Sequence, residues 1–122
     1  MNERDTYLIL DALDHLAIMN QHIEDGDLRQ LVVRDAVCLR LSAAIDALNR
    51  LDESLRDQLF GSTWPKMWAT RNRIAHAYNL VNFAVIAQTI EIDIPPLIAI
   101  LTNALDQDQP GADPPESPGE ET

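Results

Sequence analysis

The chain of 122 residues carries a formal net charge of −11, from 20 acidic and nine basic residues, with three histidines in addition. Six of the 20 acids lie in residues 106–122, so 14 acids and nine bases remain, which leaves residues 1–105 with a net charge of about −5. This acidity argues against a general nucleic-acid binder, because nonspecific affinity comes mostly from neutralising phosphates. Eight of the nine bases are arginine, so any contact with RNA would need a local arginine cluster or the help of a partner.

The length predicts one domain, and a hydrophobic content of 46% is sufficient for a helical core. Cys38 is the only cysteine, which excludes an intrachain disulfide and a cysteine-based metal site within one chain, and we expect it to be packed in the core. No charged-then-apolar leader opens the chain, and no apolar run approaches the ~18 residues of a membrane span. We therefore expect a cytoplasmic protein without a membrane segment.

Two long helices are predicted in the first half of the chain. In residues 4–23, apolar side chains recur at helical spacing, and a Glu-Asp-Gly segment then breaks the pattern. Asp27 has Gln30 three residues later, which resembles a capping box and predicts a second helix that runs to about Leu51. The apolar positions of this helix alternate between spacings of four and three, as in the seam of a helical bundle: Val37, Leu41, Ala44, Leu48 and Leu51.

A shorter helix and an aromatic-rich helix are predicted next. Residues 51–60 predict a helix that is closed by Gly61, because glycine is favoured just after helix ends. Ser62 or Thr63 is expected to cap the following helix, which carries both tryptophans and continues to the end of the arginine-rich segment. Pro65 falls in its first turn, where a missing N–H group does no harm.

The last two helices are predicted after a short connection. Residues 83–92 form one of them, and Pro95 and Pro96 open the other, which reaches Leu105. Residues 90–94 alternate between apolar and acidic side chains, a pattern that also suits a strand. The flanking helical patterns and the two prolines favour a helix.

Residues 106–122 form a polar segment with four of the seven prolines and no basic residue. Such a segment is too polar to be buried, and we expect a disordered acidic tail. The predicted fold class is all-α, an up-down bundle of four to five main helices over residues 1–105.

Two pairs of side chains have both a functional and a structural interpretation. His15 and His22 share a face of the first helix but lie about 10 Å apart along its axis, which is too far to bind one metal ion. Trp64 and Trp68, one turn apart, could stack on bases, but such a pair more often anchors a core, and we expect a core role here.

The densest group of chemically active side chains lies in residues 71–78, with the sequence RNRIAHAY. Arginine suits phosphate oxygens, histidine can move protons near neutral pH, and tyrosine offers a modifiable hydroxyl. On a straight helix Arg71 and His76 lie about 140° apart, whereas Arg73 shares a face with His76, and Arg71 shares one with Tyr78. Either the helix loosens near His76, or two chains each contribute part of one site. The second alternative predicts a dimer.

Asp46 projects from the middle of the second helix, close to its apolar seam. A buried carboxylate needs a partner, and Arg71 or Arg73 would serve. The alternative is a partly exposed aspartate on the shoulder of the helix. The motif also has a structural alternative, namely a solvated arginine-rich helix face with a histidine whose contacts are only structural.

The segment from Arg71 to Tyr78 resembles the Arg-x₄-His-x-Tyr signature of the HEPN superfamily, and specifically of HepT-like toxins that are paired with minimal nucleotidyltransferase (MNT) antitoxins. Similar proteins have a tryptophan a few residues before the motif, as Trp64 is here, and an aspartate-hydrophobic-proline-proline segment after it, as in residues 93–97. The resemblance extends over nearly all of residues 1–105. It implies an all-α bundle that dimerises, with the motifs of both subunits meeting in one cleft.

The resemblance also implies a metal-independent endoribonuclease without a cofactor. His76 would act in proton transfer as the ribose 2′-hydroxyl attacks the adjacent phosphate, and Arg71 would stabilise the phosphorane-like transition state. Asn72 would orient the polar groups of the motif. Arg73, which has no fixed role in the family, is expected to be a second phosphate contact. Tyr78 would receive AMP from the partner transferase, which would silence the toxin.

We therefore expect a homodimeric ribonuclease toxin with RNA as its substrate, an MNT-type nucleotidyltransferase as its antitoxin, and no binding to DNA or membranes. One alternative is a HEPN adaptor that binds a nucleotidyltransferase without catalysis, which the acidic surface favours. Another is a purely structural helical dimer. The chain departs from the family pattern at Ile45-Asp46, where the family has Gly-Glu. This departure bears on the packing of the helices there and on whether the acid can orient Arg71.

Overall fold

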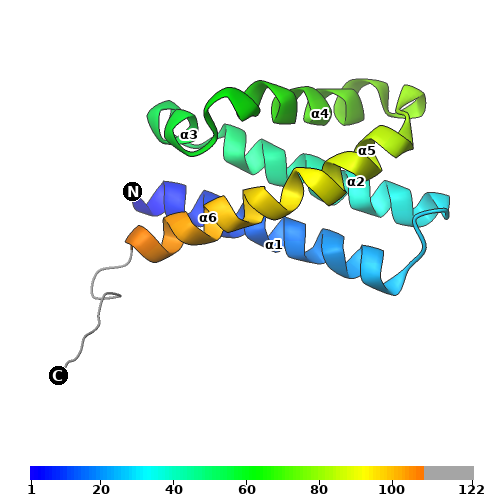
Figure 1. The fold of residues 1–122 in the computed structure, drawn as a ribbon, viewed down its shortest axis with the longest axis horizontal. Coiled ribbons are helices and arrows are strands. Elements are labelled where there is room, and N and C mark those ends of the chain that lie inside the picture. Colours follow the sequence, from blue (N-terminus) through cyan, green and yellow to red (C-terminus); the bar gives the residue numbers. More distant parts are fainter. Residues whose placement is uncertain (109–122) are drawn as a thin grey trace.

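A computed structural model describes residues 1–108, which fold into helices joined by short connections (Figure 1). The α-helices are α1 (Glu3–Asp25), α2 (Leu31–Asn49), α3 (Glu53–Phe60), α4 (Trp64–Ala77), α5 (Phe83–Ile92) and α6 (Ile94–Asp108), and the 3₁₀ turns are η1 (Gly61–Thr63) and η2 (Tyr78–Leu80). No strand occurs within residues 1–108. The predicted all-α fold class is confirmed.

Helix α2 lies in the middle of the bundle, between α1 on one side and α4 on the other (Figure 1). It runs antiparallel to both of these neighbours. The short helix α3 connects α2 to α4, and α5 leads from α4 into α6, which packs across α1. Because of this arrangement, α2 contributes one face to the core and another face to the surroundings of the motif on α4.

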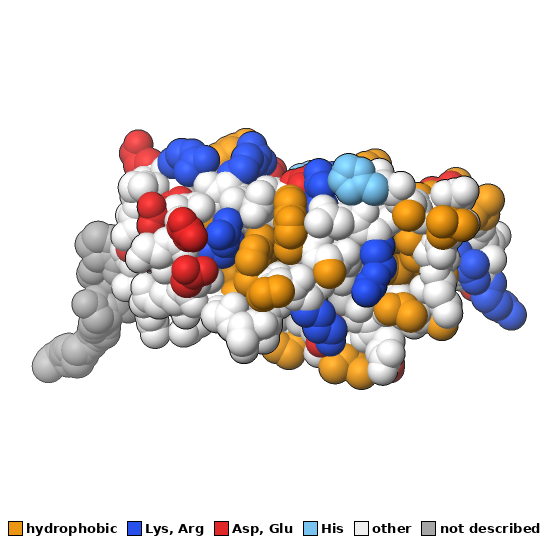
Figure 2. All heavy atoms as spheres, turned by 90° about the horizontal axis from the view of Figure 1, so that it is seen from above, with side chains coloured by type: hydrophobic (Ala, Val, Ile, Leu, Met, Phe, Trp, Pro, Cys, Tyr) orange, Lys and Arg blue, Asp and Glu red, His pale blue; other side chains and the backbone are white. Residues whose placement is uncertain are grey.

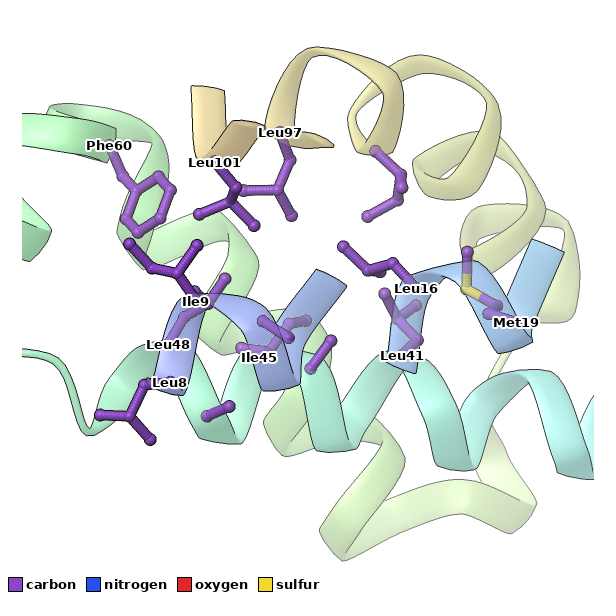
Figure 3. Close-up of a cluster of buried hydrophobic side chains, with 14 of the residues drawn as sticks. Leu8, Ile9, Leu16, Met19, Leu41, Ile45, Leu48, Phe60, Leu97 and Leu101 are labelled. Carbon is purple, nitrogen blue, oxygen red and sulfur yellow. The ribbon is translucent and has the colours of Figure 1, made fainter. Parts of the chain in front are cut away.

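The core is formed mainly by the apolar faces of α1, α2 and α6 (Figure 3). Leu16 of α1 and Leu101 of α6 are completely buried in it. Each such leucine contributes about 1.5–3 kcal/mol when it leaves water. The predicted seam of α2 is confirmed, because its members are all buried: Val37, Leu41, Ala44, Leu48 and Leu51.

Ile45, which stands where the resemblance implies a glycine, points into this core and is 2% exposed. Its neighbours in Figure 3 include Leu48 and Ile9. The bulk of the isoleucine is thus accommodated by the main core, and α2 still packs against both α1 and α4.

The predicted start of α2 at a capping box is wrong. The carboxylate of Asp27 accepts a hydrogen bond from the amide of Arg29 at 2.8 Å and forms an ion pair with its guanidinium at 2.7 Å. With the acid engaged in this local turn, the helix begins four residues later, at Leu31. Gln30 occupies the cap position and makes no capping hydrogen bond through its side chain.

The junction between α3 and α4 follows the prediction at Gly61 but not at Thr63. Gly61 has a φ of +52°, a conformation that favours glycine, and it closes α3. The hydroxyl of Thr63 donates to the carbonyl of Phe60 at 2.7 Å instead of capping α4. Pro65 lies in the first turn of α4, as predicted.

The last two helices agree with the prediction except at the C-terminal end of α6. Helix α5 has the predicted bounds, and the side chain of Asn82 accepts a hydrogen bond from the Ala84 amide at 3.0 Å to cap it. Helix α6 continues past Leu105 to Asp108, whose Oδ1 lies 3.1 Å from the ammonium group of Met1. The disorder that was expected from residue 106 is therefore wrong for residues 106–108, which are helical. The rest of the expected tail, residues 109–122, lies outside the described residues.

Within residues 1–108, no single helix has the length and apolar character to cross a membrane. Helices α5 and α6, which are bent by 42° relative to each other, meet this criterion only when they are taken as a pair.

Candidate active site

Arg71 is the most firmly held side chain of the motif. It lies on the side of α4 that faces α2, where its Nε is 2.6 Å from Oδ1 of Asp46 and its Nη2 donates to Oδ2 at 3.5 Å. The short Nε contact is an ion pair without the alignment of a hydrogen bond. Nη1 donates to Oδ1 of Asn72 at 3.1 Å, and the guanidinium carbon lies 4.9 Å from the centre of the Trp68 ring. A carboxylate, an amide and an aromatic face together hold this guanidinium in one orientation.

Both alternatives for Asp46 therefore apply at once. Its side chain is 43% exposed on the shoulder of α2, and it also pairs with Arg71, although not with Arg73. The carboxylate is one methylene shorter than glutamate, yet it reaches the guanidinium.

A stack of aromatic rings supports this side of α4. Phe60 and Trp64 are stacked with centroids 5.5 Å apart, and Trp64 and Trp68 follow at 6.1 Å. Trp64 is buried, so its expected role in the core is confirmed. Trp68 is half-buried and lies against Arg71. The stack thus links the core to the candidate site.

His76 lies in the last turn of α4 and is exposed. Within the described residues, its imidazole makes no hydrogen bond or ion pair. The chain stays helical from Arg71 through His76 and departs from helical geometry only at Ala77, with φ −148° and ψ 39°. A loosening of α4 therefore does not bring Arg71 and His76 together, and the structure of one protomer records no contact between them.

Tyr78 begins η2, and its hydroxyl donates a hydrogen bond to Oδ1 of Asp35 on α2. Burial raises the pKa of Tyr78 to about 12. This hydrogen bond and the nearby acidic groups of Cys38 and Asp35 add to the rise, and the positive charge of Arg34 opposes it. The phenol consequently keeps its proton at neutral pH.

Asp35 is a site residue that the sequence analysis missed. It lies eleven positions before Asp46, which is about 20° around a helix and about 16 Å along it, so both acids project from one face of α2. The spacing of the two acids could have indicated this from the sequence. The hydrogen bond between Asp35 and Tyr78 was not predictable, because the departure from helical geometry at Ala77 moves the phenol off the register of α4.

Arg73 lies apart from Arg71. It is exposed and lines a hollow of about 300 Å³ together with Leu80, Asn82 and Val85 at the start of α5. The structure therefore does not place the guanidiniums of Arg71 and Arg73 where one protomer could direct both at the same phosphate. Asn72 is half-buried and bonds to Arg71, which agrees with an orienting role.

Two other hollows lie away from Arg71 and His76. One of about 690 Å³ is formed by the start of α1, by α3 and by the end of α6, and one of about 390 Å³ lies between α4 and the α5–α6 pair. Neither is lined by Arg71 or His76. Figure 2, which views the molecule from the α4 side, shows basic side chains and a histidine scattered among hydrophobic ones, with acidic side chains gathered toward one end.

Metal-ligating side chains are dispersed in residues 1–108, where no group of three or more His, Cys, Asp or Glu is placed to hold an ion. His15 Nε2 lies 3.6 Å from Asp11, and its Nδ1 lies 3.1 Å from Nη1 of Arg40. Cys38 is buried, as predicted, and burial, with the charge of Asp35, raises the pKa of its thiol to about 11.

A model of the HepT-like family, described as Ribonuclease HepT-like, matches residues 9–104. The matched region includes most of α1, all of α2 to α5, most of α6, and the whole motif. Comparison with curated proteins and comparison with solved structures gave no match. The family match covers well over half of the chain and implies ribonuclease activity in general. The chain belongs to the ribonuclease HepT-like family.

Proposed function

We propose that the chain is a metal-independent endoribonuclease toxin that acts as a homodimer. The observation that carries the proposal is the anchoring of Arg71 by Asp46 within a chain that matches the HepT-like ribonucleases, with His76 exposed in the last turn of the same helix. The guanidinium has five N–H donors, and the contacts with Asp46 and Asn72 leave some of them for a phosphate.

The proposed reaction needs only protein side chains. Neutral His76 takes the proton of the ribose 2′-hydroxyl while the 2′-oxygen attacks phosphorus, and the bond from phosphorus to the 5′-oxygen breaks. The leaving 5′-oxygen takes up a proton, and the products are a 2′,3′-cyclic phosphate and a 5′-hydroxyl. Arg71 neutralises the charge on the phosphorane-like transition state.

The geometry of α4 supports a site shared by two protomers. Arg71 is directed toward α2, and His76 lies about 140° around the helix from it. Leu39 and Val32 lie on the same face of α2 as Asp35 and Asp46 and are largely exposed, as is typical of side chains that a partner covers. We propose that Arg71 of one protomer acts with His76 of the other.

Mixing Arg71→Ala protein with His76→Ala protein tests the shared site. If each site takes its arginine and histidine from different protomers, one intact site forms in every mixed dimer, and about a quarter of the wild-type activity returns after subunit exchange. If each protomer carries its own complete site, the mixture stays inactive, although each variant still dimerises.

We further propose that a partner nucleotidyltransferase silences the toxin at Tyr78. The phenol oxygen would attack the α-phosphorus of a nucleoside triphosphate, pyrophosphate would leave, and the phenol proton would pass to solvent. Tyr78 is 37% exposed, which leaves the residue reachable. The attached phosphate would add negative charge beside Asp35 and repel RNA from the end of α4.

The first experiment measures cleavage of a defined RNA in EDTA by protein whose intact mass shows no modification. His76→Ala and Arg71→Ala are expected to lower the rate by about a hundredfold or more, because they remove the proton-transfer group and the transition-state donor. Matched controls are His22→Ala, which also changes a histidine in the last turn of a helix, and Arg50→Ala, which changes an exposed arginine. Absence of cleavage by unmodified wild type over several RNAs would refute the proposal.

The net charge of −11 favours a second candidate, a non-catalytic adaptor for a nucleotidyltransferase. An adaptor would bind the transferase equally well with Arg71 and His76 both replaced by alanine. Its cellular phenotype would also survive the double replacement, whereas a ribonuclease toxin would lose its toxicity.

A further inference from the structure

The hydrogen bond from Tyr78 to Asp35 joins parts of the chain that are 43 residues apart. Asp35 lies in the second turn of α2, and Tyr78 opens η2 directly after α4. With the pair formed by Arg71 and Asp46, this hydrogen bond gives α4 two polar attachments to one face of α2. The antiparallel course of the helices explains the order, because the earlier residue of α4 meets the later residue of α2 (Figure 1).

Arg34, which precedes Asp35 on α2, contacts the other end of the segment that links α4 to α5. The guanidinium carbon of Arg34 lies 4.7 Å from the centre of the Phe83 ring, and Nε of Arg34 donates to the carbonyl of Leu28 at 2.6 Å. Leu80, in the middle of the connection, is 80% exposed. Consecutive residues of α2 thus attach both ends of the segment that links α4 to α5.

His76 lies two residues before this attachment and has no polar contact of its own within residues 1–108. The helical register cannot hold the segment beyond it, because the geometry changes at Ala77. The contact of Tyr78 with α2 is therefore the nearest polar restraint on where the last turn of α4 lies.

We propose that Asp35 is a positioning residue, which through the hydroxyl of Tyr78 holds the end of α4 against α2 and thereby fixes where His76 is presented to the Arg71 of a second protomer. This inference rests on the proposed ribonuclease function. It gives the unmodified hydroxyl of Tyr78 a role in the active enzyme, in addition to its proposed role as the acceptor of AMP. Attachment of AMP would replace the O–H donor by a P–O bond and place a phosphate beside the carboxylate, so that the restraint is lost when the site is covered.

The protonation state of the phenol agrees with this role. Burial and the Asp35 hydrogen bond raise the pKa of Tyr78 to about 12, and the hydroxyl remains a donor throughout the pH range in which RNA cleavage is measured.

The test compares Asp35→Ala and Tyr78→Phe, which remove the same hydrogen bond from its two sides. The matched controls are Asp14→Ala and Tyr7→Phe, which change an exposed residue of each type on α1. Amide hydrogen exchange is followed over residues 74–82 without RNA, and cleavage of the defined RNA is measured in parallel. Circular dichroism confirms that every variant is folded.

Both test variants are expected to speed exchange in residues 74–82 by about tenfold and to lower kcat by about ten- to a hundredfold, because the reacting groups lose their alignment. The double variant should lose no more than either single variant, since both changes break one interaction. Controls should match wild type in both measurements.

Unchanged exchange in residues 74–82, or faster exchange with full cleavage, would overturn the positioning role while the proposed ribonuclease function stands. A wild type that does not cleave would refute the ribonuclease function itself, and the positioning role with it. The exchange measurement and the wild-type rate therefore distinguish the two failures.

Discussion

Replacement of Asp46 by alanine is the most direct perturbation of the candidate site that leaves the motif itself intact. The variant removes the carboxylate 2.6 Å from Nε of Arg71 but keeps the contacts of Arg71 with Asn72 and the Trp68 ring. Arg71 should thus stay near α2 while losing its strongest restraint. Any loss of cleavage then reports on orientation, because the guanidinium is still present.

The effect on stability can be estimated from the exposure of the pair. The Arg71 side chain is 23% exposed and that of Asp46 43%, so solvent screening reduces the attraction, and exposed ion pairs contribute only about 0.2–1 kcal/mol. Nε of Arg71 is buried and makes no hydrogen bond even in the wild type, so the variant loses the ion pair and the longer hydrogen bond from Nη2. Because both contacts are partly screened by solvent, we expect a loss of about 1 kcal/mol, which lowers Tm by about 4 °C in a domain of this size.

Thermal unfolding and RNA cleavage are measured on the same Asp46→Ala preparation, with Asp14→Ala as a control for an exposed aspartate. Cleavage should fall by about tenfold or more, since Arg71 no longer presents a fixed geometry to the phosphate. Asp46→Asn, which keeps an acceptor without the charge, should lie between wild type and alanine. A Tm and a cleavage rate equal to those of wild type for Asp46→Ala would refute the conclusion that this acid orients Arg71.

Three further predictions concern the scaffold around the site. Ile45→Gly, the change toward the pattern that the resemblance implies, should lower the free energy of unfolding by about 3 kcal/mol or more. The reason is that it opens a cavity in the core and places glycine inside a helix. Equal midpoints of urea denaturation for variant and wild type would contradict this. Gly61→Ala should cost about 1 kcal/mol in the same measurement, through backbone conformation alone, because a methyl group there meets no atom within 4 Å. Stability should also fall as pH rises from about 9 toward 12. Cys38 and Tyr78 ionise in the unfolded chain at their ordinary pKa values of 9.0 and 10.0, whereas burial raises their pKa in the folded chain to about 11 and about 12. Urea titrations over this range should show a smaller fall for Cys38→Ala, and an equal fall would contradict the assignment.

The helices were largely predictable because their signals are local. The apolar seam of α2 and the glycine after α3 follow from spacing and backbone preference, and the structure confirms both. The start of α2 was not predictable from the same rules. Asp27 satisfies the pattern of a capping box, but Arg29 competes for its carboxylate. The pattern considers only the first and fourth positions of the box, so it cannot predict the effect of a residue between them.

The site was predictable where a straight helix is an adequate description. The alternatives for Asp46 included the observed pair with Arg71, because α4 is regular at that position. Tyr78 differs, since one residue with non-helical angles precedes it and directs the phenol to Asp35. The contacts that accompany this departure, Tyr78 with Asp35 and Phe83 with Arg34, join residues far apart in the chain.

The regularity of α4 argues against one of the two explanations for the spacing of Arg71 and His76, the loosened helix. A helix that loosened before His76 would allow one protomer to direct both side chains at the same phosphate, but the chain remains helical up to that residue. Arg71 is held against α2, and His76 is exposed on a different side of α4. One protomer therefore offers a fixed guanidinium and a separate imidazole, and neither the hollow of about 690 Å³ nor that of about 390 Å³ joins them. In the proposed dimer, a second protomer covers the exposed face of α2 and brings its own imidazole toward that guanidinium, and the exchange of subunits between inactive variants tests this arrangement directly.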